Sequence, residues 1–184
     1  MLPRDQKVQL ERAARHDRLT GLANRARFFA AVSETLTTAR PGSAAILYLD
    51  LDGFKAVNDT HGHAAGDTVL AVVAQRLSAL VGPADLVARI GGDELAVLCP
   101  DLAPDDPPGR LAEQLIAAVS QPIELAPYGH DRSPRNVVVV GLSIGVAVIA
   151  DPSSGVDLIV DAADRAMYEA KQAGRGTWRL ADPI

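Results

Sequence analysis

Ile90-Gly91-Gly92-Asp93-Glu94-Leu95 is the stretch that decides the fold, because it lies between two short apolar runs at residues 86–88 and 95–98. Two adjacent glycines in this setting predict a β-hairpin with its tight turn at the glycines. Since side chains alternate along a strand, Asp93 and Glu94 are expected to point to different sides of the hairpin tip. One of the acids can then face a ligand, although this tetrapeptide alone favours the interpretation as an ordinary acidic surface hairpin.

A second acidic pair, Asp50 and Asp52, ends an apolar run at residues 44–49. A run of this length predicts a buried central strand that ends at Asp50, with the acids at its mouth. Such carboxylates suit Mg²⁺, which binds one or two protein carboxylates and keeps its other positions for phosphates. Asp52 is expected to alternate to the other side of the strand and to orient its neighbours, so it is left outside the metal set.

Four motifs follow one another along the chain, at residues 16–25, residues 50–67, residues 91–95 and residues 163–175. Taken in order, they resemble the GGDEF domain of diguanylate cyclases. An ordered set that spans nearly the whole chain is far more specific than any one of its members. The sequence departs from the family at Leu95, where the family has Phe, and we expect a small repacking effect with intact chemistry.

The resemblance implies roles for the acids at the hairpin and at the strand end. Asp50, the backbone carbonyl of Leu51 and Asp93 would hold Mg²⁺ or Mn²⁺, with two or more ions in an active dimer. Asp93 and Glu94 would be the catalytic acids, Asp93 as a metal ligand that helps to take a proton from the attacking hydroxyl, and Glu94 near the phosphates. A metal ion also lowers the pKa of a hydroxyl that it polarises. The alternative reading of these acids is a solvated strand end.

The resemblance also implies a guanine site. Asn58 and Asp67 would read the base, with His63 close by, because a carboxylate accepts hydrogen bonds from the N1 and N2 donors of guanine and adenine lacks that pattern. The alternative for Asn58 and His63 is turn chemistry, since both residue types are common beside glycine in loops.

Three basic residues, Lys55, Lys171 and Arg175, are implied as phosphate ligands. Lys171 and Arg175 are expected on one face at the C-terminal end of a helix. Basic residues also favour that helix end without any ligand. The match of residues 170–175 to the family pattern is what favours the phosphate role.

Composition limits the possible partners. The chain has 184 residues, 48% of them hydrophobic, and a formal net charge of −5, which predicts one globular domain and disfavours a nucleic-acid partner. Cys99 is expected to be a buried thiol. No run approaches the ~20 apolar residues that span a bilayer, so we expect a cytoplasmic segment without membrane contact. Residues 1–15 are charged and helical in character, and we interpret them as a connector helix from an upstream region, followed by the cyclase domain at residues 16–184.

The pattern of strands and helices, with two hairpins among them, predicts an α/β (α+β) fold with a central mixed, largely antiparallel sheet flanked by helices. The resemblance implies the same fold, of the nucleotide-cyclase and polymerase-palm type. Asn24 is expected to cap the first helix of the domain, and the polar stretch around residues 58–63 to be a loop. Further helices are expected at about 64–80, 111–119 and 156–172, and strands at 137–149 and 177–180.

The function implied by the resemblance is that of a diguanylate cyclase, which condenses two GTP molecules into cyclic di-GMP with release of two pyrophosphates. Each 3′-hydroxyl would attack the α-phosphate of the other GTP, in line with the leaving pyrophosphate. One guanine site per chain implies a homodimer, enforced by an upstream sensor domain. The alternative is a catalytically silent GTP-binding regulatory module of a tandem protein with a downstream cyclic di-GMP phosphodiesterase domain. The intact acids favour the enzyme, and the net charge argues against a polymerase palm.

One regulatory motif of the family is incomplete. Many members have an Arg-x-x-Asp product-inhibition motif shortly before the Gly-Gly-Asp-Glu turn. Here that window reads Gly82-Pro83-Ala84-Asp85, so the Asp is present and the Arg is replaced by Gly82. Because the bidentate guanidinium is missing, we expect little product inhibition through this site.

Overall fold

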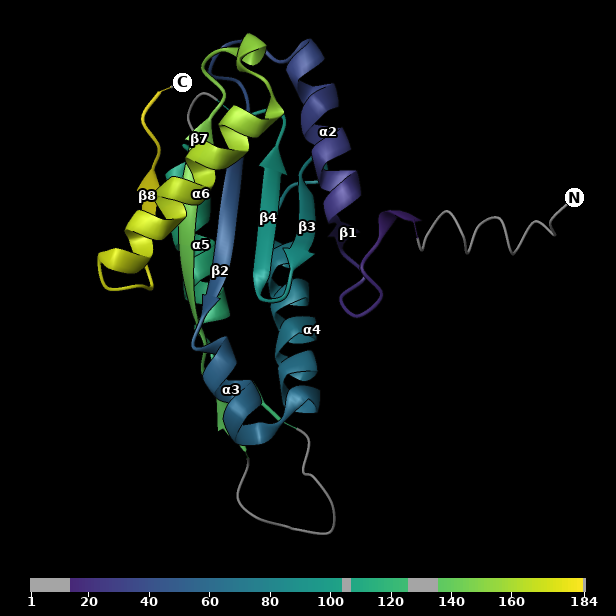
Figure 1. Cartoon of the computed structure of the whole chain (residues 1–184), viewed down its shortest axis with the longest axis vertical. Coiled ribbons are helices and arrows are strands. Elements are labelled where there is room, and N and C mark those ends of the chain that lie inside the picture. Colours follow the sequence, from purple (N-terminus) through teal and green to yellow (C-terminus); the bar gives the residue numbers. More distant parts are fainter. Residues whose placement is uncertain (1–13, 104–106, 126–135, 184) are drawn as a thin grey trace, which may run out of the picture.

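The computed structural model describes residues 14–103, 107–125 and 136–183. Residues 1–13 of the expected connector and most of the expected loop before residue 137 lie outside these ranges. Among the described residues, the main sheet has six strands in the order β1-β3-β4-β2-β7-β8, which confirms the predicted mixed sheet flanked by helices (Figure 1). The strands are β1 (Ala23–Asn24), β2 (Ala45–Asp52), β3 (Leu86–Gly91), β4 (Glu94–Cys99), β7 (Gly141–Val148) and β8 (Trp178–Leu180).

The central strand is β2, which pairs antiparallel with β4 on one side and with β7 on the other. Its side chains from Ala45 to Leu51 are buried, as expected for an apolar run covered on both faces. The strand continues to Asp52, two residues beyond the predicted end. Asp50 therefore lies inside the ladder, opposite Glu94 on β4 and Ser143 on β7.

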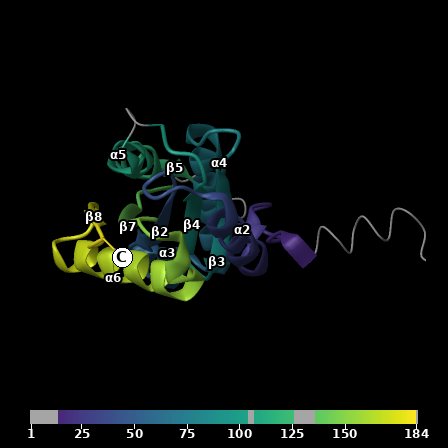
Figure 2. The same cartoon turned by 90° about the horizontal axis from the view of Figure 1, so that it is seen from above.

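Helices cover both faces of the sheet (Figure 2). Leu47 and Leu49 of β2 belong to a core cluster with residues of α4 and α5, while Ile46 and Tyr48 belong to a second cluster with residues of α2 and α6. This alternation follows from the two-residue period of a strand. The helices are α2 (Arg25–Thr38), α3 (Phe54–His61), α4 (His63–Leu80), α5 (Pro108–Val119) and α6 (Val156–Gln172), with a 3₁₀ turn, η1, at Pro152–Ser154.

Two local predictions were wrong. The stretch after β2 is a helix, α3, rather than a loop, because Phe54 and Val57 are buried on its inner side and Gly53, with φ of +83°, turns the chain into it. The single strand expected at 137–149 is divided in two. Its first part is β6 (Val137–Val138), which pairs with β5 (Ile123–Glu124) in a separate two-stranded sheet, and its second part is β7.

The last helix has the predicted bounds, and it lies directly against the sheet. A Cβ atom at Gly145 of β7 would clash with the carbonyl oxygen of Ala163 and the amide nitrogen of Met167, so only glycine permits this close approach. The packing holds the C-terminal end of α6 beside β2, and the chain then returns as β8, the predicted edge strand. In the described residues, no helix combines the length and apolar character needed to cross a membrane.

Candidate functional site

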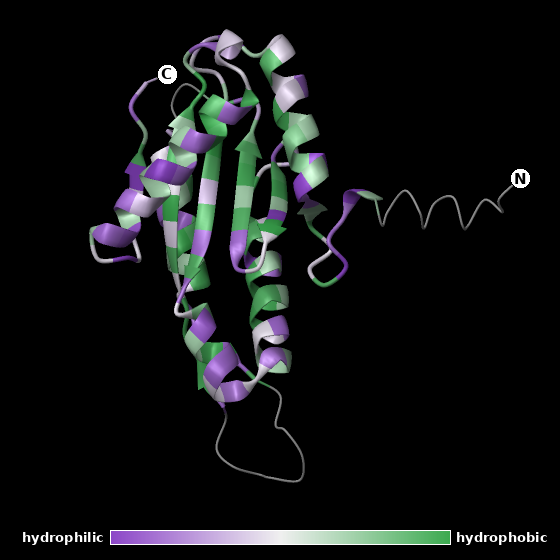
Figure 3. Cartoon of the chain, viewed as in Figure 1, coloured by the Kyte–Doolittle hydropathy of each residue, from purple (hydrophilic) through white to green (hydrophobic). Residues whose placement is uncertain are grey.

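Three structural elements bring polar side chains to one end of the sheet: the end of β2, the tip of the β3–β4 hairpin and the C-terminal end of α6 (Figure 1). Figure 3 shows hydrophilic residues at the ends of β2 and β4 nearest this tip, in contrast to the apolar remainder of both strands. Asp50 and Glu94 are direct cross-strand partners. The predicted acids of the strand and of the hairpin thus lie together.

The hairpin turn differs from its prediction by one residue. Gly91 is the last residue of β3, and the turn consists of Gly92 and Asp93, with Gly92 at φ of +44°. Asp93 is therefore a turn residue, and only Glu94 lies on a strand. The carbonyl oxygen of Asp93 accepts a hydrogen bond of 3.2 Å from the amide of Leu51, which ties the turn to β2.

Asp50 forms an ion pair with Lys171 of α6, with 2.7 Å between Oδ2 and Nζ. Burial raises the pKa of Asp50; the hydrogen bond and charge of Lys171 oppose this, and the charges of Asp93 and Asp52 add to it. The net direction is upward, because one lysine does not compensate burial and two acidic neighbours.

The pKa of Glu94 is also raised, first by burial and then by the charges of Asp50, Asp164 and Asp93. Raised pKa values at neighbouring carboxyl groups indicate a concentration of negative charge that a bound cation would relieve.

The chemistry of these donors fits a divalent cation. The described part of the chain has no group of three or more His, Cys, Asp or Glu side chains arranged to hold a metal ion. The predicted set contains two such side chains, Asp50 and Asp93, with the Leu51 carbonyl as a third oxygen. That is the sparse protein ligation typical of Mg²⁺ sites in which substrate phosphates complete the coordination.

Asp52 lies on the same face of β2 as Asp50, and the prediction that it alternates to the other side was wrong. Residues two apart on a strand share a face. Its carboxylate accepts hydrogen bonds from Ser143 Oγ, at 2.8 and 3.0 Å, and from the amide of Gly176 at 3.1 Å. Arg175 Nε lies 3.8 Å from its Oδ1. Asp52 therefore anchors the segment that follows α6.

Lys171 and Arg175 do not share a helix face as predicted, because α6 ends at Gln172 and Arg175 has a left-handed backbone with φ of +63°. The two side chains nevertheless reach neighbouring acids of β2, Asp50 and Asp52. The third predicted phosphate ligand, Lys55, is exposed on α3.

The predicted guanine-reading residues lie where α3 meets α4. The Asn58 side chain lies against Gly66, where a Cβ atom would clash with its Oδ1 atom. The next residue of α4 is Asp67, which is exposed, as is His63 in the first turn of that helix. Asn58 therefore lies beside the turn of α4 that carries Asp67, and glycine at 66 makes this approach possible.

Sequence reasoning missed the contacts that Arg89 makes with the hairpin turn and with Asp17. Arg89 of β3 donates from Nε and Nη2 to the carbonyl oxygen of Gly92, at 3.1 and 2.9 Å, and it forms an ion pair with Asp17 at 3.3 Å. A sequence signal was available, since an arginine three residues before a turn glycine is within reach of that turn's carbonyl groups.

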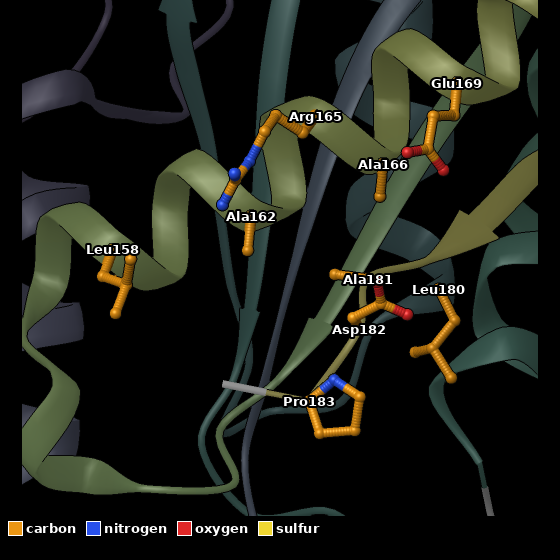
Figure 4. Close-up of a pocket in the computed structure, with 9 residues that line it drawn as sticks. All are labelled: Leu158, Ala162, Arg165, Ala166, Glu169, Leu180, Ala181, Asp182 and Pro183. Carbon is orange, nitrogen blue, oxygen red and sulfur yellow. The ribbon is translucent and has the colours of Figure 1, made fainter.

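A separate pocket of about 360 Å³ lies between α6 and the C-terminal segment. Figure 4 shows Leu158, Ala162 and Arg165 along the helix and Leu180 and Asp182 on the opposite wall. It contains none of the predicted site residues.

Comparisons with known proteins agree with this geometry. The family "Diguanylate cyclase, GGDEF domain" matches residues 14–177. The chain is 41% identical over 180 residues to the diguanylate cyclase TpbB of Pseudomonas aeruginosa, which covers 97% of the chain and 40% of TpbB. It is 40% identical to MucR, a bifunctional diguanylate cyclase/cyclic di-GMP phosphodiesterase of the same species, over 91% of the chain and 23% of MucR.

Solved structures match equally well. The GGDEF domain of TpbB superimposes with a TM-score of 0.80 at 42% identity, over 91% of this chain and 94% of that one. The coiled coil and GGDEF domain of DgcB from Caulobacter crescentus, solved in complex with c-di-GMP, gives a TM-score of 0.84 at 30% identity, over 97% and 91% of the two chains.

Proposed function

Because the chain belongs to the GGDEF family of diguanylate cyclase domains, we propose that it condenses two GTP molecules into cyclic di-GMP with release of two pyrophosphates. The observation that carries the proposal is the meeting of Asp50, Asp93 and Glu94 at one end of the sheet, with Lys171 against Asp50. The chain corresponds to 40% of the length of TpbB, so the proposal concerns this domain.

The acids supply the chemical step. Family members generally depend on a divalent cation; here Asp50, Asp93 and the Leu51 carbonyl would hold Mg²⁺ or Mn²⁺, which stabilises charge on the reacting phosphate oxygens. Asp93 would help to take the proton from the 3′-hydroxyl, and Glu94, the cross-strand partner of Asp50, would lie near the phosphates.

We assign recognition of the guanine base to α3 and α4. Asp67 would accept hydrogen bonds from N1 and N2 of guanine, while the Asn58 amide, held against Gly66, meets the remaining edge of the base. His63 lies in the same helix turn as a further contact, and Lys55 on α3 would meet a phosphate.

Lys171 and Arg175 would bind the triphosphate. They pair with Asp50 and Asp52, so their charges lie beside the proposed metal site. Lys171 pairs with Asp50, the same carboxylate that would ligate the cation. When metal and triphosphate bind together, Asp50 would bind the cation and Lys171 would bind the triphosphate.

A homodimer follows from the reaction. Each chain offers one guanine site, and each GTP must attack the other, so two chains are required to face each other. An upstream sensor domain would control this encounter, and a downstream phosphodiesterase domain, as the name of MucR indicates for that protein, is a further partner of the whole protein. We propose a cytoplasmic location, where GTP is available.

The test is direct: the chain is incubated with GTP and Mg²⁺ over a series of protein concentrations, and cyclic di-GMP is measured by chromatography and mass spectrometry. We expect product whose specific rate rises with protein concentration, as a dimeric site requires. GTP binding without product at every concentration would overturn the proposal in favour of the regulatory module, which the cyclase relatives and the complete set of acids do not favour.

A further inference from the structure

Arg89 joins two segments that are distant in sequence. Its Nε and Nη2 atoms donate to the carbonyl oxygen of Gly92 at 3.1 and 2.9 Å, and its Nη1 atom donates to both carboxylate oxygens of Asp17 at 3.3 and 3.4 Å. The Arg89 side chain is only 17% exposed. A charge-assisted contact that water reaches poorly is stronger and more directional than a surface ion pair.

Asp17 is itself held in one orientation. Its Oδ1 atom accepts hydrogen bonds from the amide and the hydroxyl of Thr20, at 2.9 and 2.7 Å, and its backbone carbonyl accepts one from Gly21 at 2.9 Å. The segment then continues into β1, where Asn24 lies opposite Arg89 in the parallel ladder with β3. Residues 17–20 thus form a tight turn placed directly against β3.

The contacts of the hairpin converge on Asp93. A bulge between Arg89 and Gly91 breaks the regular pairing of β3 with β4, so the ladder alone does not fix the turn. Arg89 holds the carbonyl oxygen of the peptide that precedes Asp93, and the Leu51 amide holds that of the peptide that follows it. With both carbonyl groups held, the direction of the Asp93 Cα–Cβ bond is constrained as well.

We propose that Arg89 is a positioning residue for Asp93, and that Asp17, by holding Arg89, makes residues 17–20 part of the same unit. The inference rests on the proposed cyclase role of Asp93. A displacement of residues 17–20 would therefore change the position of Asp93 through the Arg89 side chain, and this contact couples the start of the domain to catalysis.

The first test uses kinetics of the whole chain. Arg89→Lys keeps the positive charge near Asp17 but loses the planar fork that donates twice to Gly92, and Asp17→Asn keeps the shape of the partner without its charge. We expect kcat to fall about 10-fold or more in each variant. KM for GTP is expected to stay near the parent value, because the proposed guanine contacts lie on α3 and α4 and the proposed phosphate ligands Lys171 and Arg175 lie at the end of α6. The double variant is expected to lose less than the sum of the two effects.

The second test is independent of activity and measures hydrogen exchange at the Leu51 amide, which donates to Asp93. When the turn is released, this amide is expected to exchange about 10-fold faster in Arg89→Lys and Asp17→Asn than in the parent chain. A uniform loss of stability would speed exchange at core amides of β2 to the same degree, so the ratio of Leu51 to Leu47 exchange is the quantity to compare.

Arg76→Lys is a matched control. Arg76 also donates to backbone carbonyl groups, those of Val119, Gln121 and Pro122, but it lies on α4. We expect this variant to lose stability while kcat per folded molecule and the exchange ratio stay at parent values. Parental kcat and parental exchange in both Arg89→Lys and Asp17→Asn would overturn the inference. A parent chain that makes no cyclic di-GMP would instead refute the proposed function, and the exchange ratio would still decide whether Arg89 holds the turn.

Discussion

At the scale of single residues, Asp93 occupies a place where a side chain can be removed without disturbing the fold. It lies in the two-residue turn, and its ties to the rest of the protein run through backbone carbonyl groups. We expect Asp93→Ala to lower cyclic di-GMP synthesis at least about 100-fold, since an anionic metal ligand is lost, while GTP affinity and thermal unfolding stay near those of the parent. Product formation measured beside calorimetric GTP binding checks this, and comparable turnover in the mutant would contradict it.

The concentration of acids around Glu94 is expected to lower the stability of the folded chain. Because burial and three acidic neighbours raise its pKa, its ionised form is disfavoured in the folded chain. The resulting destabilisation is absent below the ordinary carboxyl pKa and develops as the pH rises through the raised folded value. We expect Glu94→Gln to stabilise the metal-free chain by about 0.5 to 1 kcal/mol at pH 7 and to abolish activity.

The check on Glu94→Gln is urea unfolding of parent and mutant at pH 7 and near pH 4 in the presence of a chelator. The stabilisation is expected to shrink at the lower pH, where the parent carboxyl is protonated and resembles the amide. A gain of equal size at both pH values would show that charge repulsion is not its cause.

At the scale of elements, the contact between α3 and α4 depends on Gly66. A Cβ atom there would clash with Oδ1 of Asn58, so Gly66→Ala is expected to displace Asn58 and to weaken GTP binding about 10-fold or more, through the loss of one or more base contacts. Titration calorimetry with GTP measures this directly.

Gly109→Ala is the control for this substitution, since a Cβ atom at Gly109 of α5 would lie 2.6 Å from ring atoms of Trp178, a comparable clash between other elements. We expect both mutants to lose stability and only Gly66→Ala to lose affinity per folded molecule. Equal loss of affinity in the two would place the guanine site elsewhere.

Elements with a strong periodic pattern were predicted well. The bounds of α6 and the Asn24 cap, whose side chain accepts a hydrogen bond from the Arg27 amide at 3.0 Å, follow from local sequence. The short helix α3 was missed because its polar residues resemble a loop, and only burial of Phe54 and Val57 against α4 makes it a helix. The predicted acids lie at one end of the sheet with Lys171 and Arg175. The predicted guanine-reading residues lie on α3 and α4, and Leu95 is fully buried as expected.

The contacts that sequence reasoning missed are long-range. Asp17 and Arg89 are 72 residues apart, and they meet because the parallel pairing of β1 with β3 brings the start of the domain to the hairpin. Ser143 meets Asp52 from a strand 91 residues away. No local periodicity encodes such pairs, since they depend on the order of strands in the sheet.

At the scale of the whole molecule, the site combines elements that are far apart in the sequence, since β2 lies centrally in the sheet and α6, which follows the last long strand, lies against it. We therefore expect regulation to act on segments that adjoin the elements of the site. One of them is the loop between α4 and β3, where the Arg-x-x-Asp motif is incomplete.

Restoring the arginine tests that motif. The Gly82 amide donates to Asp85 Oδ2 at 2.7 Å. The carboxylate of Asp85, the motif residue that is present, therefore stabilises the turn at residues 82–85. A Cβ atom at Gly82 would lie 3.3 Å from that oxygen, with no other heavy atom outside Asp85 within 4 Å, and Gly82 does not have a positive φ. An arginine can therefore be placed there with only a small shift of Asp85.

We expect the parent chain to show little product inhibition, because no guanidinium fork is present at position 82 to grip a phosphate or a guanine edge. Gly82→Arg is expected to tighten cyclic di-GMP binding at least about 10-fold, the gain of one charge-assisted bidentate contact. Gly82→Lys, which adds the charge without the fork, should gain much less affinity.

Calorimetry with cyclic di-GMP on the parent, Gly82→Arg and Gly82→Lys chains measures this difference, and the gain is expected to be lost in Gly82→Arg/Asp85→Ala. Tight binding by the parent chain that disappears in Asp85→Ala would contradict the prediction. It would show that cyclic di-GMP displaces the Gly82 amide from Asp85 and binds this carboxylate without an arginine at position 82.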